Sequence, residues 1–158
     1  MKRKSKPTDI GTVFAVPLSD GSSVLGQVVG EQREVLNSVT CAFFNHRTSS
    51  TSSDVPDLVT LHPIAIQFIT RDLLNKRVWK PLDVRKVTVD KNLFPFEETR
   101  SKGWVGAKMI GSGIIINFLE AFFGLRPWDM MKDPAYFDRL LVSPELKPKE
   151  VTYKIPQQ

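Results

Sequence analysis

GTVFAVPLSDGSSVLGQVVG, residues 11–30, is the stretch that decides the fold of this chain. The pair Asp20-Gly21 stands between two apolar runs, which is a strong signal for a β-hairpin. It predicts strands over residues 12–18 and 23–29, joined by a primed turn in which glycine takes a positive φ at no steric cost. The stretch therefore predicts a folding nucleus and indicates no reaction chemistry.

Apolar side chains occupy both faces of the predicted hairpin. Pro17 cannot donate a ladder hydrogen bond and predicts a sheet edge or a bulge, and Gly26 predicts a bend or a close backbone approach. A sheet that is apolar on both sides must be covered on both sides. One face holds Phe14, Val16, Leu18, Val24 and Val28, and the other holds Val13, Ala15, Leu25 and Val29.

The positive charge of the chain is concentrated at its start. The chain has 158 residues and a net charge of +5, and no acidic residue precedes Asp9. The rest of the chain is close to neutral, so the charge does not mark a basic domain. We expect residues 1–8 to be a disordered basic tail and residues 9–158 to be a single globular domain. The basic residues of the tail are Lys2, Arg3, Lys4 and Lys6.

Composition predicts a cytoplasmic protein. Cys41 is the only cysteine, so no intramolecular disulfide is possible, and it lies in an apolar run that predicts a buried, unreactive thiol. No apolar run of signal-peptide type follows the basic start. The most apolar window, residues 109–125, contains Glu120 and is shorter than the ~20 residues of a membrane span.

Downstream of the hairpin, strands come first and helices last, which indicates an α+β fold. We expect an antiparallel, strongly bent sheet or small barrel of about five to six strands, with two C-terminal helices packed on it. The first helix follows Gly111-Ser112-Gly113 and stops at Gly124, and the second starts at Asp133 as N-cap and ends at Ser143. Further strands are expected at 35–45, 65–69, 78–80 and 103–109, a Ser/Thr-rich exposed loop at 46–57 and a helical turn at 71–77.

No pattern in the sequence indicates catalysis, a cofactor or a metal. Cys41, His46 and His62 lack the spacing and the number of ligands of a zinc site, and nothing activates the thiol. The glycines at 111 and 113 precede a helix, but the lysine of a phosphate-binding loop is missing. We therefore expect no catalytic, cofactor-binding or metal-binding residues and no enzymatic activity.

The hairpin carries a resemblance to a known family. The residues 11–18, GTVFAVPL, with Asp20-Gly21 and then 26–28, GQV, resemble the opening of the immunity protein 26 family of bacterial polymorphic-toxin systems. Val78-Trp79-Lys80-Pro81 is similar to a Trp-Lys motif that precedes a proline in that family. Trp128 with Asp133-Pro134 and Tyr136 is similar in kind. Thr12 stands where members usually have an acidic residue.

The resemblance implies a protein partner, a cognate toxin domain that is bound and blocked without catalysis. The matched motif is a folding hairpin, so it does not indicate which surface binds. Aromatic and charged residues near predicted connections are the candidates: Phe94, Phe96, Glu97, Glu98, Arg126 and Trp128. The alternative is a small β-barrel that binds nucleic acid through the basic tail. The sequence does not indicate the oligomeric state.

Overall fold

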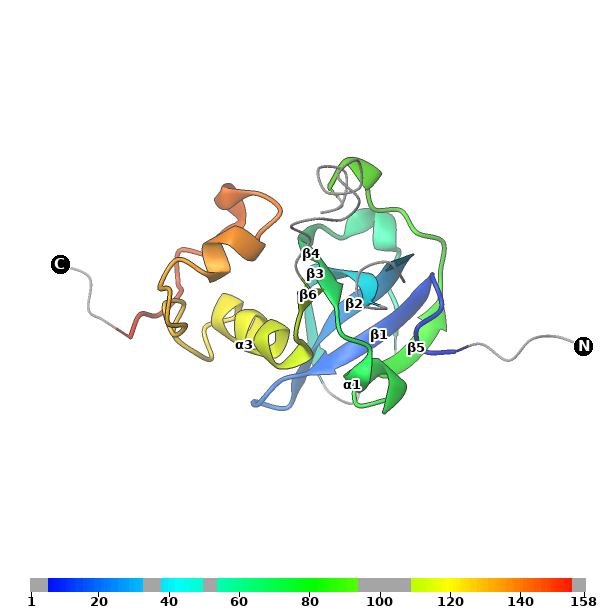
Figure 1. Cartoon of the computed structure of the whole chain (residues 1–158), viewed down its shortest axis with the longest axis horizontal. Helices are drawn as coiled ribbons and strands as arrows, with labels where there is room; N and C mark the ends of the chain where they lie inside the picture. The colour runs from blue at the N-terminus through cyan, green and yellow to red at the C-terminus, as the bar shows by residue number, and fades with distance from the viewer. Residues whose placement is uncertain (1–5, 33–37, 50–53, 94–108, 155–158) are drawn as a thin grey trace, which may run out of the picture.

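The computed structural model describes residues 6–32, 38–49, 54–93 and 109–154. Six strands form one sheet in the order β5-β1-β2-β3-β4-β6 (Figure 1). The pair β4–β6 is parallel, which corrects the expectation of a wholly antiparallel sheet. The two edge strands, β5 and β6, do not pair with each other in the described part of the chain, so the sheet is open and not a barrel. The strands are β1 (Thr12–Pro17), β2 (Ser22–Gln32), β3 (Ser38–Ser49), β4 (Pro63–Ile69), β5 (Lys80–Val84) and β6 (Met109–Ile110).

Two α-helices and four short 3-10 helices join the described strands. None of these helices is long and apolar enough to span a bilayer. In Figure 1, α3 and the C-terminal segment lie beside the sheet and α1 lies near β5. Leu74 of α1 belongs to the same apolar cluster as the buried residues of α3. The elements are α1 (Asp72–Asn75), α3 (Ser112–Phe122), η1 (Leu58–Thr60), η2 (Lys91–Leu93), η3 (Phe137–Leu140) and η4 (Pro144–Leu146).

The hairpin forms, but its turn is of another type than expected. Leu18 N–H donates to the Ser22 carbonyl at 2.8 Å, and Gly21 N–H donates to the Leu18 carbonyl at 3.1 Å. Gly21 has φ +86°, whereas Ser19 and Asp20 do not have positive φ. This is a three-residue loop with a left-handed glycine at its end, and not a primed turn, in which the first central residue also has positive φ.

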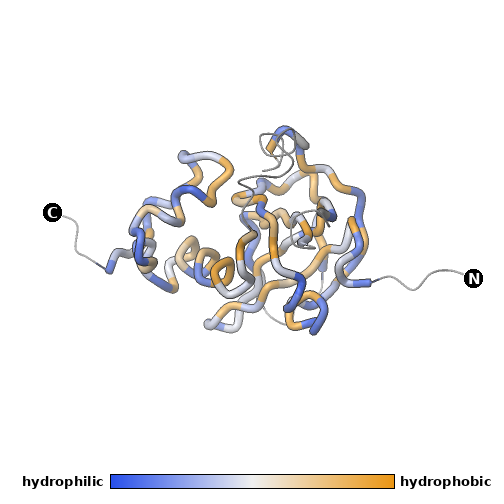
Figure 2. The backbone as a smooth tube through the Cα atoms, viewed as in Figure 1, coloured by the Kyte–Doolittle hydropathy of each residue, from blue (hydrophilic) through white to orange (hydrophobic). Residues whose placement is uncertain are grey.

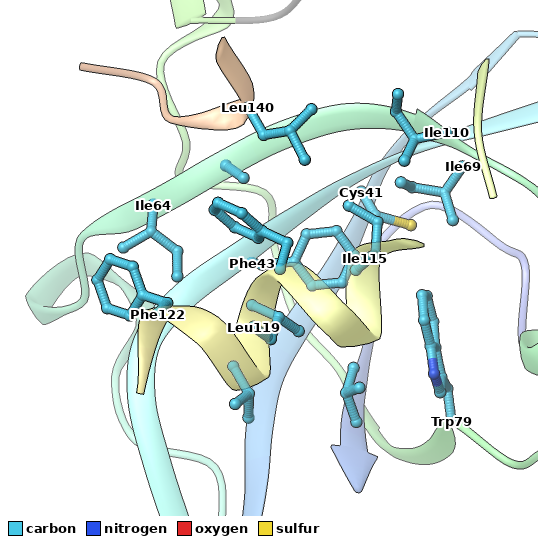
Figure 3. Packing of buried hydrophobic residues seen from close by; sticks show 14 of the residues in the cluster. Cys41, Phe43, Ile64, Ile69, Trp79, Ile110, Ile115, Leu119, Phe122 and Leu140 are labelled. Carbon is cyan, nitrogen blue, oxygen red and sulfur yellow. The ribbon is translucent and has the colours of Figure 1, made fainter. Parts of the chain in front are cut away.

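Both faces of the sheet are buried, as the two-sided hairpin predicts. Phe14, Val16 and Val28 belong to one apolar cluster, and Val13 and Leu25 belong to a second cluster on the opposite face. Figure 2 shows the central strands and α3 as largely hydrophobic, with hydrophilic colours in the peripheral turns. The helix α3 covers the first face with a stripe of buried residues (Figure 3): Ile115, Phe118, Leu119 and Phe122.

Gly26 lies at a register shift in the pairing of β2 with β3, and the group that approaches it most closely is a ring and not a backbone. A Cβ at this position would be 2.6 Å from Cε2 of Phe14, its cross-strand partner. The Phe14 ring stacks on Trp79 with centroids 5.4 Å apart, and Phe43 meets both rings edge-on. The missing side chain of Gly26 therefore makes the space that the aromatic cluster of Phe14, Phe43 and Trp79 occupies.

Several expected strand boundaries are wrong: β2 continues to Gln32 and β4 starts at Pro63, where strands over 23–29 and 65–69 were expected. The loop expected at 46–57 starts later, because β3 continues to Ser49 and pairs with Ser22–Val24 of β2. This pairing satisfies the backbone of a segment whose side chains are too polar to predict a strand. The strand expected at 78–80 starts at Lys80 and runs through Pro81, which is tolerated because β5 is an edge strand. Of the strand expected at 103–109, only Met109 lies within the described residues.

The second C-terminal α-helix is absent, because the segment after Asp133 forms only the short 3-10 helix η3. The expected capping contact exists, since Ala135 N–H donates to Asp133 Oδ1 at 3.0 Å. The chain then becomes extended at Leu141, and Val142 N–H donates to the Ile64 carbonyl of β4 at 3.0 Å. A tertiary backbone hydrogen bond thus replaces the next helical turn.

The end of the expected basic tail, residues 6–8, forms a turn with Asp9. The turn is closed by the hydrogen bond from Asp9 N–H to the Lys6 carbonyl.

Helix α1 ends on a residue with unfavourable backbone geometry. Arg77 has φ +58°, in the left-handed region that favours glycine. Its N–H donates to the Leu74 carbonyl at 3.0 Å, and Val78 N–H donates to the Leu73 carbonyl at 3.0 Å. These two bonds form a Schellman motif, in which the position of Arg77 is usually glycine.

Replacing Arg77 with glycine is expected to raise the free energy of unfolding by up to about 1 kcal/mol, because it relieves a left-handed non-glycine residue. Urea denaturation of wild type and variant measures the difference. A lower stability of the variant would mean that contacts of the arginine side chain outweigh the backbone strain.

Candidate functional site

The structure places two of the six candidate contact residues. Arg126 is exposed over 46% of its side chain. Trp128 is 1% exposed, and its Nε1 donates to Asp138 Oδ1 at 2.9 Å. The indole packs against Phe118 and Phe137 with ring centroids 5.7 Å away in each case, so the expectation of a surface tryptophan is corrected by this packing. The other four candidates, Phe94, Phe96, Glu97 and Glu98, lie outside the described residues.

Arg126 forms an ion pair with Glu120, and this residue of α3 also accepts a hydrogen bond from the hairpin turn. Its Nε donates to Glu120 Oε2, and the Glu120 side chain is only 3% exposed. The other carboxylate oxygen, Oε1, accepts the Ser19 N–H at 2.7 Å. Burial raises the pKa of Glu120, but the hydrogen bonds from Arg126 and Ser19 outweigh this effect and the pKa is lowered overall.

Replacing Glu120 with glutamine is expected to destabilise the fold by about 1–3 kcal/mol at neutral pH, since the charged hydrogen bonds are lost. A carboxyl group whose pKa is lower in the folded state stabilises above its unfolded pKa of about 4.3, and this stabilisation is lost as the pH falls through the folded value. The gap between wild type and variant should therefore narrow on acidification. Unfolding midpoints measured from pH 7 to pH 3 test this, and a constant gap would contradict it.

A groove lies at the C-terminal end of α3. It has a volume of about 550 Å³ and an apolar floor that includes Phe122, Phe123 and Leu146. The guanidinium of Arg47 lies 4.9 Å above the Phe123 ring and also pairs with Asp20 of the hairpin turn at 3.7 Å. The groove could accept an apolar side chain of a partner, but its rim carries both signs of charge, from Glu145, Lys147, Lys149 and Glu150.

A second hollow lies along the free edge of β5. Its volume is about 200 Å³, and its lining combines Lys6 and Arg77 with Leu82 and Val84. The end of the strand is held in place by buried Gln27, whose Nε2 donates to the Arg85 carbonyl at 2.9 Å. The exposed Lys6, Arg77, Asp83 and Val84 line this hollow, so the edge can offer charge and apolar contact to another protein.

The β5 edge was not among the sites expected from the sequence, because the strand was expected to end at Pro81 and residues 82–89 carry only a weak pattern. The left-handed backbone of Arg77 has no signature in a single sequence, since arginine is an ordinary helix residue. The edge could be recognised only once the strand order was known.

The thiol considered for reaction chemistry is not activated. Cys41 is fully buried in the first apolar cluster, as expected, and burial raises the pKa of its thiol. The thiol therefore stays protonated and unreactive at physiological pH. Within residues 6–32, 38–49, 54–93 and 109–154, no group of three or more His, Cys, Asp or Glu side chains could hold a metal ion.

Comparison with known proteins identifies the family. The family model for immunity protein 26 matches residues 9–104. The matched region contains the hairpin and strands β1 to β5, while β6, α3 and the C-terminal segment follow it. Searches of curated proteins and of solved structures gave no match. The match covers more than half of the 158 residues and confirms the resemblance of the hairpin, so this chain belongs to the immunity protein 26 family.

Proposed function

We propose that this chain is an immunity protein that binds a cognate bacterial toxin domain in the cytoplasm of the producing cell and blocks it stoichiometrically. The observation that carries the proposal is the match of residues 9–104 to the immunity protein 26 family. The architecture supports the proposal, because the hairpin residues that identify the family are buried in the two apolar clusters of the sheet. The exposed residues around these clusters are left to bind a partner.

The described surface offers contacts of the kinds that bind a protein without catalysis. The exposed part of Arg126, the groove beside Phe123 and the edge of β5 offer charged and apolar contacts. Contacts of these kinds make protein interfaces, in which a buried apolar centre is surrounded by a polar rim. Inhibition then follows from covering the toxin, and one immunity protein is consumed for each toxin molecule.

The test is co-expression of this chain with the toxin domain encoded by the adjacent gene, followed by titration of the purified toxin. We expect growth to be rescued and residual toxin activity to reach its minimum at a molar ratio near one. Neutralisation at a ratio far below one would indicate an enzyme. A lack of both rescue and complex formation would contradict the proposal.

A further inference from the structure

The free edge of β5 and the end of α1 form one surface with a strong excess of positive charge, which we name the β5 edge surface. It contains four exposed cations, two exposed valines and one carboxylate: Lys6, Lys76, Arg77 and Lys80, with Val78, Val84 and Asp83. Lys6, Arg77 and Val84 line the same hollow, which places these segments side by side. Figure 1 shows α1 next to β5, beside the N-terminal end of the described chain.

Within the described part of the chain, none of the four cations forms a salt bridge. The nearby carboxylates are already engaged. Asp83 Oδ2 accepts from Arg85 Nε at 2.6 Å, and Asp9 Oδ2 accepts the Lys6 N–H at 2.9 Å. Among the described residues, the four cations therefore outnumber the carboxylates of Asp9 and Asp83 beside them.

The apolar side chains of this surface are also exposed. Val78 is 48% exposed and Val84 is 57% exposed, whereas the neighbouring Trp79 is fully buried. Arg77 stands at the rim with φ +58°, so the fold accepts a backbone strain that glycine would relieve. A strained residue is retained when its side chain has a function, and the exposed group of Arg77 is its guanidinium.

We propose that the β5 edge surface is the docking site for an acidic face of the toxin domain, with the exposed cations meeting its carboxylates and the exposed valines adding apolar contact. This inference rests on the proposed function and adds the chemistry of the partner. Complementary charge accelerates association and excludes partners of like charge. A basic immunity surface selects a toxin whose contacting face carries Asp and Glu.

The features of this surface favour a protein over a nucleic acid. Binding of single strands uses exposed aromatic rings on which the bases stack. The aromatic residue of this surface, Trp79, is buried beneath it, and the exposed side chains between the cations are aliphatic. Valines flanked by cations match a protein interface.

The test compares Lys80→Glu with Lys132→Glu, a charge reversal of equal size in the C-terminal segment. The orange part of Figure 1 lies across the molecule from β5 and contains that segment. The probe is the purified toxin domain from the adjacent gene. We expect Lys80→Glu to lower the association rate constant about tenfold at low salt, and Lys132→Glu to leave it within about twofold. Raising the salt concentration should reduce the difference.

Arg77→Gly provides a second variant that does not depend on tolerance of a charge reversal. We expect it to unfold no earlier than wild type and yet to bind the toxin domain more weakly. Acetylation of lysines in the complex gives an independent readout, in which Lys76 and Lys80 are protected and Lys132 is not.

The outcomes separate this inference from the proposed function. Tight binding that is equally unaffected by Lys80→Glu and Arg77→Gly would overturn the docking site and leave the immunity function intact. Absence of any complex would overturn both. Binding of a DNA or RNA duplex that these two variants abolish, with toxin binding unchanged, would assign the surface to nucleic acid instead.

Discussion

Replacing Phe118 with alanine is expected to lower the free energy of unfolding by about 3–5 kcal/mol, the usual cost of removing a fully buried phenylalanine. Phe118 joins α3 to the C-terminal segment. Its ring centroid lies 5.7 Å from those of Trp128 and Phe137, and all three side chains are at most 1% exposed. Because a domain of this size is stable by only about 5–15 kcal/mol, the loss would be a large fraction of the total.

Denaturation by urea, followed by tryptophan fluorescence and by circular dichroism, measures this loss. Phe123→Ala is the matched control at the C-cap of the same helix, because Phe123 is only half-buried and should cost clearly less. If both variants lost the same stability, the packing around Phe118 would not be the anchor of the C-terminal segment. Non-coincident transitions of the two probes would show that unfolding is not two-state.

Replacing Gly26 with alanine is expected to cost about 1–3 kcal/mol, because the added methyl group overpacks the core. The new Cβ would lie 2.6 Å from Phe14 Cε2 and 3.2 Å from the Ala42 carbonyl oxygen. Phe14 has little room to yield, since its ring is stacked on Trp79. The strain should therefore reach the whole aromatic cluster and not remain at one contact.

A double-mutant cycle with Phe14→Leu measures the origin of this cost. Leucine lacks the ring atoms that the new Cβ would meet, so we expect Gly26→Ala to cost clearly less in that background. Gly113→Ala is the control of opposite sign, because it lies in α3 with nothing within 4 Å of its Cβ and should stabilise by about 0.5–1 kcal/mol. Equal costs of Gly26→Ala in both backgrounds would contradict the proposed clash.

Local sequence patterns predicted the elements whose backbone hydrogen bonds join residues that are close together in the chain. Asp20-Gly21 predicted the hairpin, and Gly124, with φ +80°, is the left-handed residue that ends α3. The turn type was wrong because a glycine at the last loop position suits more than one turn. The helix expected after Asp133 failed because Val142 is bonded to β4, and no local pattern encodes a hydrogen bond to a strand about 80 residues earlier.

The candidate contact residues show the same difference between what a local pattern predicts and what packing decides. Residue type made Arg126 and Trp128 equal candidates on one connector, but packing separated them into an exposed cation and a core side chain. The β5 edge surface could not be predicted, because it joins Lys6 to residues 76–84 through the pairing of β5 with β1. A surface made by strands that are distant in the sequence has no period or motif of its own.

The sequence by itself determined the two-sided hairpin, the helix at α3, the inert cysteine and the family. These depend on alternation, glycine geometry and local spacing, which act between neighbours along the chain. Tertiary contacts alone show that the sheet is open, that Trp128 is buried and that Lys6 and Arg77 lie together beside β5. Those features depend on strand order and long-range packing, where the free energy comes from contacts between segments and not from either segment alone.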